Sequence, residues 1–311
     1  MTRTINKIGL CVLLLTITAS CRDTKTETAK PVATTTQKTD TSLKPKTVLS
    51  KEFNTYWYAG EAEITSYKLE QARYGEMRDG NAVLVFVTED FLPHVQVKAD
   101  NYNKTNTPVL KLNATKNFNT GIYPYSIMQS TFYPVANNQH ALKVSASIQE
   151  WCGHVYAQLN NRDRFQITSH SYFQSEADQN FNIEKTWTEN ELWTKLRIDP
   201  KSLPTGTISI IPSLEYTRLK HVDIKSYDAI ATLENGVYKL SYPKLDRILK
   251  INYNVQFPYD ILGWEDTVIS GYGTNRKTLT TKATKLVALK SAYWGKNSNE
   301  DEVLREKLKL Q

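Results

Sequence analysis

Cysteine is scarce in this chain. Only three occur among 311 residues, at Cys11, Cys21 and Cys152. Cys11 lies in an apolar run near the N-terminus that is typical of a removable leader. If the leader is cleaved and Cys21 carries a lipid, Cys152 is the only thiol left. An intrachain disulfide and a cysteine-based zinc cluster are then excluded.

The chain also lacks the common catalytic and nucleotide-binding motifs. It contains no G-x-S-x-G elbow, no P-loop and no H-E-x-x-H sequence. Gly271-Tyr272-Gly273 indicates a loop and lacks the strand-to-helix context of a phosphate-binding turn. No repeat of fixed period and no regular alternation of strands with helices is evident, which argues against Rossmann and TIM folds. We therefore expect no cofactor and no metal.

Excess positive charge is concentrated near the N-terminus. The formal net charge is +7. Residues 1–20 contribute +2, and residues 22–50 contribute +3 from six basic and three acidic side chains. Subtracting both from +7 leaves +2 for the rest of the chain. This balance argues against a nucleic-acid partner and favours a basic segment close to an anionic lipid surface.

Residues 1–20 have the three parts of a signal peptide. A basic start is followed by the apolar run at residues 8–15, which is too short for a transmembrane helix of about 20 residues. Thr18-Ala19-Ser20 then precedes Cys21 and resembles the lipobox of bacterial lipoproteins, although Thr18 stands where that motif usually has Leu. The resemblance implies a lipid on the Cys21 sulfur. The alternative is an ordinary cleaved signal with a chance cysteine.

Three regions are predicted along the chain. The signal peptide covers residues 1–20, and the lipidated Cys21 and a disordered tether cover residues 21–50. The tether is rich in Thr, Lys and Ala and has no aromatic residue, so it cannot bury enough apolar surface to fold. Residues 51–311 are predicted to form a single β-rich domain. The expected location is the cell envelope, with the lipid anchor in the outer membrane, facing the periplasm or the cell surface.

Alternating apolar and polar residues predict mostly antiparallel β-structure, as a sandwich or half-open barrel with one or two short peripheral helices. Asp79-Gly80 predicts a hairpin that pairs residues 63–77 with residues 82–89, and Asn235-Gly236 predicts a second hairpin. These two turns suggest two similar β halves. Residues 97–120 are expected to form a long loop or weak hairpin, and residues 141–159 show the clearest alternation. A turn at residues 160–163 should lead to the next strand.

One helix is well signalled inside the domain. Thr188 and Glu191 have the spacing of a capping box, an apolar stripe follows, and Pro200 ends the helix. A short helix beginning near Ser298 should close the chain.

Glu150, Cys152 and His154 are candidate catalytic residues. If the strand pattern at residues 142–148 continues, the three side chains share one face, because side chains alternate along a strand. His154 could then activate the thiol while Glu150 orients the imidazole. The alternative is a small buried cysteine beside a hydrogen-bonded histidine, or a bulge at Gly153 that reverses the register.

Glu70, Arg73 and Tyr74 are candidate ligand-binding residues. Glu70 and Arg73 could pair across a cavity and bind a polar ligand. A solvated strand edge or a structural ion pair would explain the same residues.

Three segments resemble a family of bacterial envelope proteins of unknown function. They are residues 67–76, residues 83–91 and Gln149-Glu150-Trp151-Cys152-Gly153-His154, and the Thr278–Thr284 segment and Tyr293-Trp294 fit as well. Some members of that family are labelled septum formation inhibitor Maf. True Maf proteins are cytoplasmic nucleotide pyrophosphatases with an N-terminal Ser-x-Ser-Pro-Arg-Arg motif. This chain lacks the motif and carries an export signal, so the resemblance implies no activity.

The sequence leaves three functions open. The first is a lipid-anchored binding or structural module for a lipid, glycan or protein partner. The second is a thiol-dependent enzyme for acyl transfer or hydrolysis that uses Cys152 and His154. The third is a carrier of apolar cargo, as in lipoprotein-sorting chaperones with half-open β barrels.

The lipid anchor yields a direct prediction. Mass spectrometry of the mature polypeptide should find Cys21 acylated at the new N-terminus, because signal cleavage removes residues 1–20. The polypeptide should be recovered with the membrane fraction. An unacylated polypeptide in the cytosol, with residues 1–20 still attached, would contradict the anchor.

Overall fold

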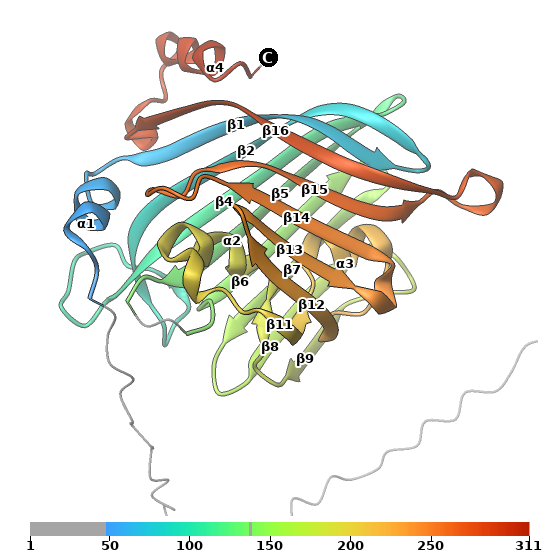
Figure 1. Cartoon of the computed structure of the whole chain (residues 1–311), viewed down its shortest axis with the longest axis horizontal. Coiled ribbons are helices and arrows are strands. Elements are labelled where there is room, and N and C mark those ends of the chain that lie inside the picture. The colour runs from blue at the N-terminus through green and yellow to red at the C-terminus, as the bar shows by residue number, and fades with distance from the viewer. Residues whose placement is uncertain (1–47, 137–138, 311) are drawn as a thin grey trace, which may run out of the picture. The chain divides into compact units, whose positions relative to one another are not determined.

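The computed structural model describes residues 48–136 and 139–310. The predicted leader, the lipidation of Cys21 and most of the predicted tether lie outside the described residues. The described chain is mostly β: one large open sheet of 16 strands, mainly antiparallel, with four short α-helices (Figure 1). The prediction of mostly antiparallel β-structure is confirmed.

The sheet is continuous from one edge strand to the other. Its strands in chain order are β1 (Ala62–Arg73), β2 (Glu76–Leu92), β3 (Val97–Lys98), β4 (Thr107–Thr120), β5 (Tyr123–Pro134), β6 (Lys143–Glu150), β7 (Gly153–Asn161), β8 (Phe165–Ser171), β9 (Gln179–Ile183), β10 (Trp187–Thr188), β11 (Gly206–Ile211), β12 (Tyr227–Glu234), β13 (Val237–Tyr242), β14 (Arg247–Tyr253), β15 (Ile261–Ser270) and β16 (Lys277–Ser291). The spatial order runs from β10 through β11–β16 to β1, and then through β2 and β4–β8 to β9. β3 pairs with β2 off this path, and β10 and β11 are parallel. The first strand therefore lies near the centre of the sheet, between β16 and β2.

The four helices are α1 (Lys51–Trp57), α2 (Glu189–Ile198), α3 (Leu214–Lys220) and α4 (Val303–Lys307). The sheet bends around α2 and α3, which lie between its two ends (Figure 1). Leu192 and Leu196 of α2 and Leu214 of α3 are buried in one core with side chains from both ends of the sheet. These two helices are thus internal, whereas the sequence suggested helices only at the periphery.

Hairpin turns decide the register of the sheet. Asn235-Gly236 forms the predicted turn, with positive φ at both residues as a two-residue hairpin of type I′ requires. Residues 63–73 do pair with the strand that contains residues 82–86, but the register differs from the prediction because the turn is at Tyr74-Gly75, where both φ angles are positive. Gly80 instead lies inside β2, where an added Cβ would come within 2.3 Å of the Asn117 carbonyl oxygen. Asp79-Gly80 marks a close approach of β4 and is not a turn.

Two other segments differ from the sequence predictions. Residues 97–120 contain the long strand β4, where a loop or weak hairpin was expected. Residues 141–159 contain two strands, β6 and β7, joined by a tight turn at Trp151-Cys152. The turn after β7, at residues 162–164, is confirmed. The suggestion of two similar β halves is replaced by one uninterrupted sheet.

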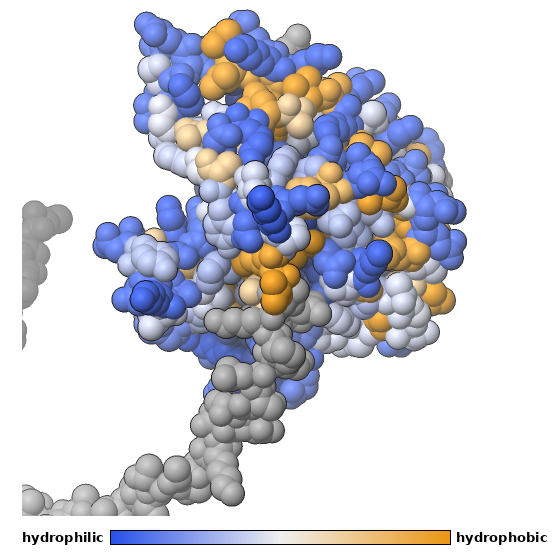
Figure 2. Space-filling model, turned by 60° about the vertical axis from the view of Figure 1, so that its left-hand side comes forward, coloured by the Kyte–Doolittle hydropathy of each residue, from blue (hydrophilic) through white to orange (hydrophobic). Residues whose placement is uncertain are grey.

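A smaller apolar cluster lies on the outer face of the sheet. Ile64 and Val87 pack there with Leu308, which follows α4. Figure 2 shows hydrophobic patches among hydrophilic side chains, including one in the upper part, where Figure 1 places α4. The C-terminal segment therefore covers part of the outer face.

Helix α2 starts with the predicted capping box. The Thr188 hydroxyl accepts a hydrogen bond from the Glu191 backbone N–H, and the Glu191 carboxylate accepts one from the Thr188 N–H. Glu191 is fully buried, and its carboxylate also accepts from the backbone N–H of Ala141 and contacts His140. The cap therefore also joins the helix to the loop before β6.

Buried ion pairs hold α2 at its other end. Arg197, 1% exposed, donates to both carboxylate oxygens of Glu63 on β1, at 2.6 and 2.7 Å. The Tyr56 hydroxyl donates to the same carboxylate. Burial would raise the pKa of Glu63, but the charge and hydrogen bonds of Arg197 outweigh it and lower the pKa.

We predict that Glu63→Gln lowers the free energy of unfolding by about 3 kcal/mol, because it leaves the buried Arg197 charge without its carboxylate. Urea unfolding at neutral pH measures the loss. The difference from wild type should shrink as the pH falls through the lowered pKa of Glu63, since protonation removes the same charge.

Glu265→Gln is the matched control. Glu265 pairs with Lys250 at 3.4 Å with both side chains about a third exposed or more, so its loss should cost less than about 0.5 kcal/mol. Equal losses in the two variants would contradict the argument.

Candidate ligand-binding pocket

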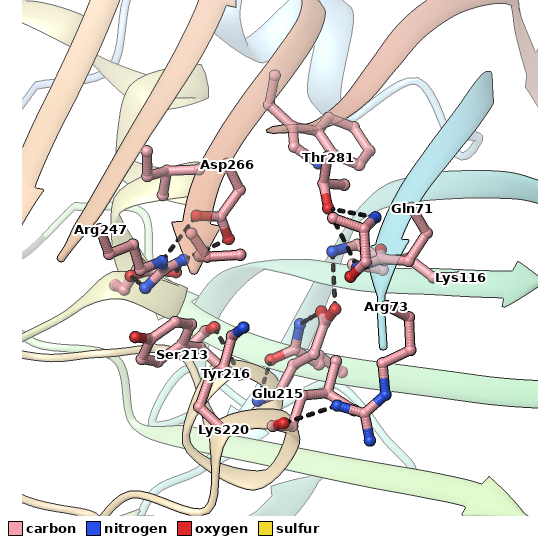
Figure 3. Close-up of a pocket in the computed structure, with 18 of the residues that line it drawn as sticks. Gln71, Arg73, Lys116, Ser213, Glu215, Tyr216, Lys220, Arg247, Asp266 and Thr281 are labelled. Atoms are coloured by element: carbon pink, nitrogen blue, oxygen red, sulfur yellow. Dashed lines mark hydrogen bonds and ion pairs between the residues drawn. The ribbon is translucent and has the colours of Figure 1, made fainter. Parts of the chain in front are cut away.

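A pocket opens between α2, α3 and the inner face of the sheet. It contains about 1250 Å³ of space not filled by atoms, counting the part open to solvent. Figure 3 shows polar and charged side chains reaching into it from several elements. β1, β2, β4 and β5 form one wall, β14, β15 and β16 form the other, and α2 and α3 close it between them. These seven strands are consecutive neighbours in the middle of the sheet, so the pocket lies where the sheet bends around the two helices.

Part of the wall is apolar. Trp193 of α2 and Trp264 of β15 lie edge to face, with ring centroids 5.3 Å apart. Leucine side chains continue this surface on the strands and on α3: Leu84, Leu112, Leu219 and Leu249. An organic ligand with an apolar or aromatic body could pack here.

A buried charge network forms another part of the wall. Arg247 of β14 donates to both oxygens of Glu189 at 2.6 and 2.9 Å, and to both oxygens of Asp266 at 2.8 and 2.9 Å. Its guanidinium also lies 4.0 Å from the centre of the Tyr216 ring. Burial opposes the charge, but the two carboxylates raise the pKa of Arg247 well above its ordinary value. These groups satisfy one another and fix the first turn of α2 against the sheet.

A second network joins the helices to β4 and β5. The carboxylate of Glu215 on α3 accepts from Lys116 at 2.8 Å and from the Gln129 side-chain amide at 2.8 Å. Asn190 of α2 donates to Gln129 at 2.9 Å and accepts from the backbone N–H of Leu214. The network positions α3 relative to α2 and fixes the polar floor of the pocket.

Arg73 has a different environment. It is 7% exposed, and its guanidinium donates to the Leu219 carbonyl oxygen at 2.7 Å and to the hydroxyls of Tyr74 and Tyr125 at 3.1 and 3.0 Å. All three acceptors are neutral, and its Nε atom has no hydrogen-bond partner. No carboxylate of the described residues forms an ion pair with Arg73.

Lys220, at the end of α3, lies near Arg73. Its ammonium donates to the Ile269 carbonyl oxygen at 2.6 Å and forms no ion pair within the described part of the chain. Burial lowers the pKa of Lys220, and the positive charges of Arg73 and Arg247 lower it further, against a weaker opposite effect of Asp266. In Figure 3 the Lys220 side chain lies below the Arg247–Asp266 pair, and Arg73 lies at the lower right, on the other side of Glu215.

Of the three predicted ligand-binding residues, the structure brings two to the pocket. Arg73 and Tyr74 line it. Glu70 is not among the lining residues, because it alternates with Gln71 and points to the outer face of β1. The expected Glu70–Arg73 pair is not formed.

Glu150, Cys152 and His154 do not share one face of one strand. The chain turns at Trp151-Cys152, so that Gln149 pairs with His154 across the hairpin. Cys152 and His154 are both exposed, and no hydrogen bond joins them among the described side chains. Glu150 instead accepts from the backbone N–H of Cys152 at 2.7 Å. The catalytic role of these residues stays a prediction, without the geometry on which it relied.

Several pocket residues escaped the sequence analysis. Glu215 and Lys220 belong to α3, Arg247 to β14 and Asp266 to β15, and these elements meet β1 around one pocket only in the folded protein. Glu189 was seen only as part of a helix start. One signal was available in the strand pattern. Arg247 and Asp266 each lie two residues from a buried apolar side chain, Leu249 on β14 and Trp264 on β15, so both charged residues face the same side of the sheet as the core.

Among residues 48–136 and 139–310, no group of three or more His, Cys, Asp or Glu side chains is arranged to hold a metal ion. No helix within those residues has the length and apolar character needed to cross a bilayer.

Comparison with known proteins adds one structural likeness. No family model matches the chain, and no curated protein is significantly similar to it in sequence. One solved structure is described as a β-barrel-like protein of domain of unknown function DUF1849 from Brucella abortus. It aligns over 74% of this chain and 98% of its own, with a TM-score of 0.38 and 8% identity. The resemblance to envelope proteins stays a prediction.

The exposed hairpin yields a prediction about Cys152. The hydrogen bond from the Cys152 thiol to the Glu150 carboxylate, together with the charge of that carboxylate, raises the pKa of the thiol. Iodoacetamide should therefore label Cys152 in the folded protein, but more slowly than a free cysteine peptide near neutral pH, with a rate that rises with pH. Peptide mass spectrometry measures the labelling site by site.

Two variants separate the effects of Glu150 and His154 on the rate of Cys152 labelling. Glu150→Gln should speed labelling near neutral pH, because it removes the raising charge. His154→Ala should leave the rate unchanged. A wild-type rate above that of the free peptide, lost in His154→Ala, would contradict this reading and favour an activated thiol.

Proposed function

We propose that this protein is a ligand-binding module of the cell envelope, which holds a small amphipathic molecule in the pocket between α2, α3 and the sheet. A lipid on Cys21 and the tether at residues 22–50 would keep the domain beside the membrane. The observation that carries the proposal is a large pocket with one apolar wall and several converging polar groups, which is the usual character of a small-molecule site.

The wall supports binding more than catalysis. Its carboxylates, Glu189, Asp266 and Glu215, are all held in ion pairs with Arg247 or Lys116. A general base or nucleophile needs a free pair of electrons directed at a substrate. These carboxylates instead fix the walls, and a rigid, preformed wall favours affinity because little has to be ordered on binding.

An amphipathic ligand suits the composition of the wall. Trp193 and Trp264 offer an aromatic surface, and the leucines of the strands extend it. Burying an apolar body there contributes about 25 cal/mol per Å² removed from water. Polar groups near the mouth, including Tyr272, which is 68% exposed, would meet the polar end of the ligand.

N-phenyl-1-naphthylamine, an uncharged aromatic probe that fluoresces in apolar surroundings, tests this function. It should bind the wild-type protein at about one molecule per chain. Ala114→Phe, which fills the pocket from β4, should weaken binding about tenfold or more, equivalent to ~1.4 kcal/mol.

Asn117→Phe is the matched control, because Asn117 is exposed on the same strand and does not line the pocket. It should bind the probe as the wild type does. No binding by wild type, or equal binding by Ala114→Phe and wild type, would overturn the proposed function.

A further inference from the structure

Two cations of the pocket form no ion pair with a carboxylate of the described residues. Arg247 is paired with Glu189 and Asp266, and Lys116 with Glu215. Outside the pocket, the buried Arg197 is paired with Glu63. Arg73 and Lys220 have only neutral acceptors among the described residues. Arg247, Lys116 and Arg197 thus each have an acid of their own, whereas the buried Arg73 and the half-buried Lys220 do not among the described residues.

Leaving Arg73 and Lys220 without an ion pair costs free energy in the folded protein. A buried charge without an opposite charge loses hydration and gains no Coulomb energy in return. Arg73 and Lys220 also repel each other, which agrees with the lowered pKa of Lys220. A negative group placed near both would remove the repulsion and replace the lost hydration.

Hydrogen-bonding capacity is also unused at this end. The Nε atom of Arg73 has no hydrogen-bond partner in the part of the chain that the structure describes, although the residue is more than nine-tenths buried. Two residues earlier on the same face of β1, the Oε1 atom of Gln71 is buried without a partner while its amide nitrogen donates to Thr281. A ligand could thus accept from Arg73 and Lys220 and donate to Gln71.

Apolar side chains adjoin these cations. Leu219 contacts Arg73 through its carbonyl oxygen, precedes Lys220 in the chain and lines the pocket with both. Val268 and Trp264 of β15 line the same pocket. A free inorganic anion would leave this apolar surface uncovered, whereas an organic anion would cover it.

We infer that the Arg73–Lys220 end of the pocket binds the anionic group of an organic acid whose apolar body lies against Trp193 and Trp264. The inference rests on the proposed function and names its ligand class: a carboxylate, sulfonate or phosphate monoester on an apolar scaffold. Arg73 would contribute a planar guanidinium and Lys220 a point charge, a combination suited to an oxyanion.

A pair of probes with one scaffold tests the inference. 1-Anilinonaphthalene-8-sulfonate carries a sulfonate, and N-phenyl-1-naphthylamine is its uncharged counterpart. The wild-type protein should bind the sulfonate at least about tenfold more tightly, because only the sulfonate can accept charge-assisted hydrogen bonds from Arg73 and Lys220. Arg73→Met and Lys220→Met should each remove most of this preference, measured as the ratio of the affinities for the two probes.

Lys282→Met is the matched control. Lys282 is exposed on β16, next to the inward-facing Thr281, so the variant loses the same charge from the outer face. It should keep the wild-type preference. If Arg73→Met unfolds, as circular dichroism would show, Lys220→Met carries the test alone, since Lys220 is only half-buried.

The outcomes separate the two proposals. Equal affinity of wild type for both probes, or a preference that survives both substitutions, would overturn the anion site while the pocket function stands. Sulfonate binding that depends on Arg73 and Lys220, without binding of the uncharged probe, would support the anion site and overturn the apolar part of the proposed function. Binding of neither probe would overturn both.

Discussion

The ion pairs at the two ends of α2 are the constraint on which the rest of the structure depends. Glu189 in the first turn is held by Arg247 of β14, and Arg197 in the last turn holds Glu63 of β1. Each charge also suits the helix dipole at its end. Because β14 and β1 are separated in the sheet by β15 and β16, one short helix fixes the distance between two distant parts of a long sheet.

That constraint explains why a pocket exists at all. A bent sheet of this size encloses more space than two helices of 10 and 7 residues can fill. The polar network of Glu215, Gln129 and Asn190 keeps α3 from sliding into the remaining space. The pocket therefore follows from the rigid attachment of α2 and α3 to the sheet. Most of the charged side chains that line it are the same side chains that hold these helices in place.

The sequence predicted features that depend on neighbouring residues and missed those that depend on distant ones. The capping box at Thr188 and the turn at Asn235-Gly236 were found because local chemistry determines them. The turn at Tyr74-Gly75 was misplaced, since Asp79-Gly80 carries the stronger local signal and only the approach of β4 explains Gly80. The candidate site was found in part, through Arg73 and Tyr74 on one strand. Its other charges come from elements up to about 190 residues away.

The contrast between Arg247 and Arg73 separates structural charges from those available to a ligand. Both are buried and both line the pocket, yet Arg247 has two carboxylates and Arg73 has a carbonyl oxygen and two tyrosine hydroxyls. Removing either carboxylate from Arg247 would weaken the fold, so the Arg247 guanidinium is not available to bind a ligand. Arg73 lacks the ion-pair stabilisation that one nearby acidic side chain would provide. A fold that balances its other buried arginines gains nothing in stability from this exception, and such local departures are expected where binding requires them.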